Sequence, residues 1–162
     1  QLQVMDPLKS GSHFDICESM RRVLISMEKK ITDRHLDVDA DIPEEPILVR
    51  GDNDMITQVI YNLLENATKF AREGTTLYLG VTTIDGKARV TVRNLGDTIP
   101  AEELPLLFER FHKSDKSRSE DKDGVGLGLY IVKTILEQHK EKINVTSENG
   151  VTTFAFSLSM DA

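Results

Sequence analysis

Apolar side chains recur every three to four residues in three segments of the chain. This spacing places them on one face of an α-helix, so it predicts helices over residues 14–31, 54–71 and 127–139. Asp52 precedes the second segment and suits the N-cap position of its helix, because a carboxylate accepts hydrogen bonds from the free N–H groups there. The first segment carries its apolar side chains at Ile16, Met20, Val23, Leu24, Met27 and Ile31.

Other segments alternate apolar and polar residues with the period of two that is typical of a strand with one buried face. These segments are 35–40, 46–50, 77–81, 88–92, 142–147 and 152–160. The third and fourth, and likewise the last two, read as hairpins, and a short helical piece is expected at 102–108. The pattern predicts an α/β fold. The predicted architecture is a two-layer α/β sandwich, whose mixed, mostly antiparallel sheet of about five strands is covered on one face by three helices.

Composition excludes more of the possible functions of the chain than of its possible folds. The 162 residues carry a formal net charge of -7, which argues against nucleic acid as a partner, since that requires a surplus of Lys and Arg on one face. No apolar run approaches the ~18 residues of a membrane span. The single cysteine, Cys17, fits a core position in a reducing compartment. The four histidines lack metal-ligand spacing, so we assign them no metal.

The helix over 54–71 carries a polar stripe beside its apolar face, formed by Asn62, Asn66 and Lys69, with Gln58 and Glu65 at the outer edge. Asparagine is a mediocre helix former, so two in mid-helix need a reason. One reason is a solvated face. The other is a binding site for phosphate and metal, because an amide oxygen is a suitable ligand for Mg²⁺ and an ammonium group complements the charge of phosphate.

Three alternating glycines, Gly124, Gly126 and Gly128, precede the third helix. They let the backbone approach a ligand and point N–H groups at an anion, although a plain loop before a core helix explains them as well. Asn94 ends an alternating strand. Counting by twos from Ala88 turns its side chain toward the helices, in the same direction as Val92.

These motifs follow one another in an order and spacing that resembles the ATP-binding catalytic domain of bacterial two-component sensor histidine kinases. That domain belongs to the GHKL ATPase superfamily, with gyrase, the heat-shock chaperone ATPase and mismatch-repair ATPases. The resemblance covers nearly the whole chain and implies ATP and Mg²⁺ as cofactors. It also implies a catalytic domain over 13–162 with a lid at about 109–125, and a remnant of the preceding linker over 1–12.

In this family the asparagine helix supplies the metal ligand, which falls on Asn66. The resemblance further implies that Asn62 faces the phosphates, that Lys69 contacts them and that Phe70 lines the pocket. Gyrase-like relatives have a Glu at the place of Asn62, so the Asn favours transfer to a protein side chain over hydrolysis. Glu65 is then either a base, a group that supports the metal, or a solvated carboxylate. Catalytic roles therefore fall on Asn62, Glu65 and Lys69.

The resemblance places the remaining nucleotide contacts in the turn that begins at Asn94, in the pair Phe108 and Phe111, in the lid and in the glycine turn. The lid cations Arg110, Lys116 and Arg118 are equally consistent with solvated charges. The implied contacts are Asn94, Gly96, Thr98, Ile99, Phe108, Arg110, Phe111, Lys116, Arg118, Gly124, Val125, Gly126, Leu127, Gly128 and Leu129.

One motif departs from the family pattern of Asp-x-Gly-x-Gly. Asn94 stands where relatives have the Asp that accepts a hydrogen bond from the adenine 6-amino group, and Thr98 replaces the second glycine. An uncharged amide weakens that bond by roughly 1 kcal/mol, and it can also donate to a 6-oxo group. We expect weakened adenine affinity and relaxed purine selectivity. A β-carbon at Thr98 is expected to restrict the turn.

The implied activity is that of a protein-histidine kinase, in which the γ-phosphoryl group of Mg-ATP passes to a histidine on a separate dimerisation domain. The response regulator is an indirect partner. No acceptor histidine motif is found in the chain, so we expect the isolated fragment to be monomeric and unable to phosphorylate itself. It would be the cytoplasmic portion of a membrane-anchored kinase. The alternatives are a GHKL-type hydrolase and a degenerate nucleotide-binding or regulatory module without kinase activity.

Overall fold

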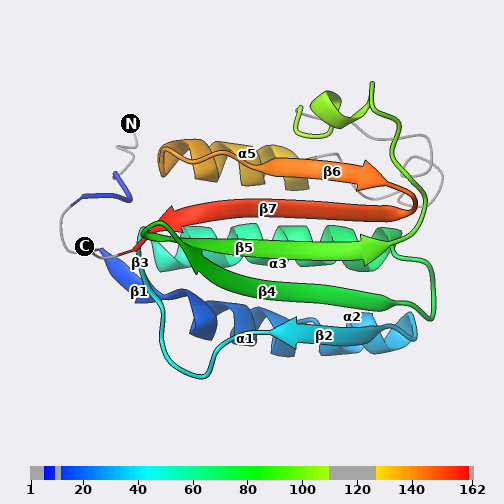
Figure 1. Cartoon of the computed structure of the whole chain (residues 1–162), viewed down its shortest axis with the longest axis horizontal. Helices are drawn as coiled ribbons and strands as arrows, with labels where there is room; N and C mark the ends of the chain where they lie inside the picture. The colour runs from blue at the N-terminus through cyan, green and yellow to red at the C-terminus, as the bar shows by residue number, and fades with distance from the viewer. Residues whose placement is uncertain (1–5, 10–11, 110–126, 161–162) are drawn as a thin grey trace.

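A five-stranded sheet forms one layer of the molecule and the helices form the other, as Figure 1 shows. The computed structural model describes residues 6–9, 12–109 and 127–160. Across the sheet the strands lie in the order β2 (Asp37–Asp41), β4 (Thr76–Ile84), β5 (Lys87–Leu95), β7 (Val151–Ser159) and β6 (Asn144–Glu148). β2 runs parallel to β4 and the other neighbours are antiparallel, which confirms the predicted sheet.

The first predicted helix is interrupted. The apolar spacing predicts one helix over 14–31, whereas the structure has α1 (Ile16–Ser26) and α2 (Glu28–Asp33), which meet at Met27. Periodicity does not reveal the break because the apolar side chains on both sides of it, and Met27 itself, are buried in the same core. The prediction of a single helix here was therefore wrong.

Two longer helices complete the helical layer, so the described residues form four α-helices rather than the predicted three. α3 (Asn53–Phe70) begins where the sequence predicts, because the Asp52 carboxylate accepts a hydrogen bond from the N–H of Met55 at 2.9 Å. α5 (Gly128–Gln138) packs beside α3, and both lie on the same face of the sheet (Figure 1).

A buried histidine, His139, joins the C-terminal end of α5 to the N-terminal end of α3. His139 is 2% exposed, and its Nε2 accepts a hydrogen bond from the N–H of Asp52 at 3.1 Å, while its Nδ1 lies 2.9 Å from the carbonyl oxygen of Ile135. Gly51 is required beside it, since an added β-carbon would lie 2.8 Å from the ring. His139 therefore has a structural role in linking α5 to α3.

Two short segments lie outside the main sheet. The extended run predicted at 46–50 forms β3 (Leu48–Arg50), which pairs with β1 (His13–Asp15) in a separate two-stranded sheet and is bridged by Val49 to Met160, just after β7. The helical piece predicted at 102–108 is reduced to one turn of 3-10 helix, η1 (Leu104–Leu106). No helix of the described residues combines the length and the apolar character needed to cross a membrane.

Alternation along the strands separates a buried face from an exposed face. On β5, Val90 and Val92 are 0% exposed against the helices, and Arg93 points to the opposite side. The β4–β5 and β6–β7 hairpins have two-residue turns at 85–86 and 149–150, with positive φ at all four residues. These tight turns fix the strand register, which decides what lies beside Asn94.

Candidate functional site

The end of α3 is joined directly to the end of β5. Ala71 and Gly96 form an isolated antiparallel bridge, and the N–H of Arg72 donates to the carbonyl oxygen of Leu95 at 2.7 Å. A β-carbon added at Gly96 would lie 2.5 Å from the carbonyl oxygen of Phe70, so only glycine permits this approach. The predicted pocket residue Phe70 and the predicted base-binding turn are therefore brought together.

Asn94 lies beside this joint. It is 4% exposed and pairs with Thr152 of β7, on the face that carries the helices, as the alternation predicts. Its side-chain amide has no hydrogen-bond partner among the described residues. Arg34 Nε is the one fully buried side-chain polar atom without a partner among the described residues, so the Asn94 amide is not sealed from solvent and is available to hydrogen-bond a ligand.

Sequence reasoning missed two hydroxyl groups at this end of the site. Ser147 Oγ accepts from the N–H of Ile99 at 2.8 Å and lies 2.8 Å from Thr152 Oγ1, and both residues are buried. Asn94, Thr152 and Ser147 occupy one row across β5, β7 and β6. Only the strand order places them together, because no local pattern relates these residues to Asn94.

Thr98 is accommodated where the family has glycine. It is not among the described residues with positive φ, so its β-carbon creates no backbone strain. Its Oγ1 accepts a hydrogen bond from the N–H of Gly150 at 2.7 Å, and the N–H of Gly96 donates to the carbonyl oxygen of Gly150 at 2.8 Å. Thr98 thus attaches the turn to the β6–β7 hairpin, and its effect on the turn beside the base stays a prediction.

The polar stripe of α3 runs past this joint toward α5. Asn62 is 9% exposed and its Nδ2 donates to the carbonyl oxygen of Gly128 at 3.0 Å. Lys69 and Phe70 are half-buried, with the ammonium 5.8 Å from the centre of the Phe70 ring. Asn66, which lies between Asn62 and Lys69 along α3, is half-buried, and its amide has no hydrogen-bond partner in the described part of the chain.

The donor set around Asn66 fits a magnesium ion held largely by phosphate. The described residues contain no group of three or more His, Cys, Asp or Glu side chains that could hold a metal by themselves. Mg²⁺ commonly keeps several waters and combines one or two protein oxygens with substrate phosphates. The amide oxygen of Asn66 is suited to be that protein ligand.

Comparison with known proteins agrees with this geometry. Residues 51–162 match the family described as histidine kinase-, DNA gyrase B-, and HSP90-like ATPase. The chain belongs to this family. Within it, the chain is similar to the sensor histidine kinase CusS of Escherichia coli, with 41% identity over 110 residues that cover 68% of this chain and 23% of CusS. It is 33% identical to the sensor histidine kinase YkoH of Bacillus subtilis over 139 residues, 86% of this chain and 30% of YkoH.

Solved structures of the family have the same fold. The catalytic domain of histidine kinase ThkA superposes with a TM-score of 0.81 at 26% identity, covering 91% of this chain and 94% of that one. ThkA in complex with the response regulator TrrA gives a TM-score of 0.76 at 27% identity, covering 93% and 42%. This ATPase-family chain is thus a catalytic domain of the histidine kinase type. It spans only about a quarter of the length of the curated relatives CusS and YkoH.

Glu65 of the ATPase domain is engaged away from the polar stripe. Its carboxylate accepts a hydrogen bond from Lys30 of α2 at 2.6 Å, and the same ammonium lies 3.1 Å from the hydroxyl of Tyr61. The hydrogen bond to the Glu65 carboxylate, with help from Tyr61, raises the pKa of Lys30, so this ammonium stays charged at neutral pH. This contact ties α2 to α3, and no described group links Glu65 to Asn66.

The remaining predicted residues divide into two groups. Phe108 packs edge-on against Phe154 of β7, with ring centres 6.0 Å apart, while Leu127 precedes α5 and Leu129 packs on the core. The predictions that lie outside the described residues are Arg110, Phe111, Lys116, Arg118, Gly124, Val125 and Gly126.

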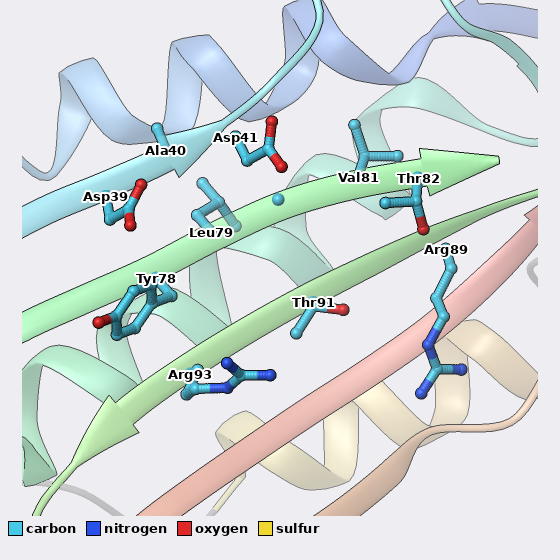
Figure 2. A pocket seen from close by; sticks show the side chains of 11 residues that line it. Asp39, Ala40, Asp41, Tyr78, Leu79, Val81, Thr82, Arg89, Thr91 and Arg93 are labelled. Atoms are coloured by element: carbon cyan, nitrogen blue, oxygen red, sulfur yellow. The ribbon is translucent and has the colours of Figure 1, made fainter.

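A groove lies on the opposite face of the sheet, where Figure 2 shows Asp39 and Asp41 of β2 on one side and Arg89 and Arg93 of β5 on the other. Arg93 lies over the ring of Tyr78, 5.7 Å from its centre. None of the predicted site residues lines this groove. It is therefore separate from the candidate nucleotide site, which faces the helices.

Proposed function

We propose that this domain binds Mg-ATP between α3, the end of β5 and the start of α5. The observation that carries the proposal is Asn94, a residue 4% exposed on the helix-covered face, whose amide makes no hydrogen bond to another described residue and lies next to the joint between α3 and β5. The purine would complete the hydrogen bonds of this amide. Membership of the ATPase family supports a nucleotide as the ligand.

The phosphates would lie along the polar stripe of α3. Lys69 supplies positive charge, and the first N–H groups of α5 have no acceptor within their own helix. Asn66 would hold Mg²⁺, which neutralises phosphate charge when bound. The protein's part in such chemistry is to position groups and to complement charge.

We further propose transfer of the γ-phosphoryl group to a histidine on a separate dimerisation domain of the same kinase. The names of CusS and YkoH as sensor histidine kinases support this activity, and so does Asn62, which offers no carboxylate to activate water. A response regulator would then receive the phosphoryl group, as the complex of ThkA with TrrA suggests by analogy. The domain would act on the cytoplasmic side and be a monomer when isolated.

Calorimetry with a non-hydrolysable ATP analogue and Mg²⁺ tests the binding step. We expect micromolar affinity that falls sharply when Mg²⁺ is replaced by a chelator. No heat of binding at millimolar analogue would overturn the proposal in favour of a degenerate regulatory module.

A second measurement separates transfer from hydrolysis. The fragment incubated with ATP alone should form no phosphohistidine and release little phosphate, and addition of the dimerisation domain should allow transfer. Steady ATP turnover by the isolated fragment would instead identify a hydrolase.

A further inference from the structure

Both ends of the Asn62 amide are hydrogen-bonded within the protein. Its Oδ1 accepts from Nε2 of Gln58 at 2.6 Å, and its Nδ2 donates to the carbonyl oxygen of Gly128 at 3.0 Å. Asn62 is buried, whereas Gln58, one helical turn earlier, is exposed. The three residues form a chain of hydrogen bonds that runs from the surface of α3 to the first residue of α5.

The carbonyl group of Gly128 gives this chain its direction. A carbonyl oxygen can only accept, so the NH₂ end of Asn62 must face Gly128 and its oxygen must face Gln58. Gln58 then has to present its own NH₂ end. A donor at position 58 and an acceptor at position 128 thus select one of the two orientations of the Asn62 amide.

We propose that Gln58 is a positioning residue for nucleotide binding, which orients Asn62 and through it holds the first turn of α5 against α3. The inference rests on the proposed function, in which the phosphates lie between these two helices. Asn66 and Lys69 follow Asn62 along the same stripe of α3, and the hydrogen bond from Asn62 to Gly128 places the first turn of α5 beside that stripe. A displaced first turn would no longer lie beside these groups. Gln58 itself touches no phosphate.

Replacing Gln58 by Glu reverses the orientation that position 58 demands. A carboxylate only accepts, so Asn62 must either turn its NH₂ end away from Gly128 or leave two acceptors facing each other. For Gln58→Glu we expect the Kd of the ATP analogue with Mg²⁺ to rise about tenfold in calorimetry. Gln58→Met removes the donor without adding charge, and a rise of about threefold is expected.

Thr57→Glu is the matched control for added charge. Thr57 is adjacent in sequence, but its hydroxyl lies 3.3 Å from Asn53 Oδ1 and contacts neither Asn62 nor Gly128. We expect its Kd to stay within about twofold of the wild type, because a charge at this partly exposed position is screened by solvent. In an Asn62→Ala background, Gln58→Glu should add no further loss, since the residue it orients has been removed.

The outcomes separate the two proposals. A wild-type chain that binds no analogue at millimolar concentration overturns the proposed function, and the role of Gln58 with it. A wild-type chain that binds, with Gln58→Glu no weaker than Thr57→Glu, overturns the role of Gln58 alone. The role of Gln58 is also overturned if Gln58→Glu weakens binding equally in the wild type and in the Asn62→Ala background. A lowered unfolding midpoint of Gln58→Glu without any change in Kd overturns it as well. If Gln58→Glu does not fold, Gln58→Met and its double variant with Asn62→Ala decide the matter.

Discussion

The base end of the candidate site, around Asn94, is built on strands, whereas the phosphate end, around Asn62 and Asn66, is built on helices. At the base end, three neighbouring strands place Asn94, Thr152 and Ser147 in one row. At the phosphate end, a side-chain hydrogen bond from Asn62 to Gly128 connects α3 to the start of α5. Backbone ladders hold side chains in fixed register, while a helix pair can slide or tilt. We therefore expect the base end to be preformed and the phosphate end to adjust.

The largest effect is expected where the two ends join. Gly96→Ala places a β-carbon 2.5 Å from the carbonyl oxygen of Phe70, so the joint must open. The free energy of unfolding, measured by urea denaturation, should fall by about 2–3 kcal/mol. Gly128→Ala is the stability control, since its added β-carbon meets nothing within 4 Å. Equal stability of the two variants would mean that the ends are not rigidly joined.

The next largest effect is expected at the phosphate end. Asn66→Ala removes the amide oxygen proposed to hold Mg²⁺ and should raise the Kd of the Mg-ATP analogue roughly 100-fold, or about 2.7 kcal/mol. Asn53→Ala on the same helix is the control, because Asn53 bonds only Ser19 and Thr57 in the described structure. A Kd that changes equally in both variants would remove Asn66 from the site.

A moderate effect of opposite sign is expected at the base end. Asn94→Asp supplies a charged acceptor to the adenine 6-amino group and should tighten ATP binding by about fivefold to tenfold. The same change should weaken GTP binding, because a carboxylate cannot donate to the 6-oxo group. Both affinities are measured by calorimetry for the wild type and the variant. No gain for ATP would contradict the assignment of Asn94 to the base.

The smallest effect is expected at Glu65, outside both ends. Glu65→Gln breaks a half-exposed ion pair with Lys30 and should change the free energy of unfolding by less than about 0.5 kcal/mol. Nucleotide affinity and phosphotransfer should remain near the wild-type values. Asp33→Asn, which breaks the exposed pair with Lys29, is the matched control. A large loss of phosphotransfer in Glu65→Gln alone would restore Glu65 as a base.

Local patterns predicted the elements that depend on local contacts. Period-two alternation correctly placed Asn94 on the inward face, and the Asp52 cap correctly marked the start of α3. The same reasoning failed at Met27, because apolar spacing continues through the break between α1 and α2. It also left the role of Glu65 open, since its partner Lys30 lies on another helix.

The sequence alone therefore determined the order of the motifs, the faces of the strands and the candidate chemistry of a nucleotide site. Helical and strand periods are properties of neighbouring residues, so they can be read without knowing the fold. The contacts that assemble the site required the tertiary structure. Ala71 with Gly96, Asn94 with Thr152, and Asn62 with Gly128 are pairs far apart in the chain. Strand order and helix packing bring them together, and no local pattern encodes that choice.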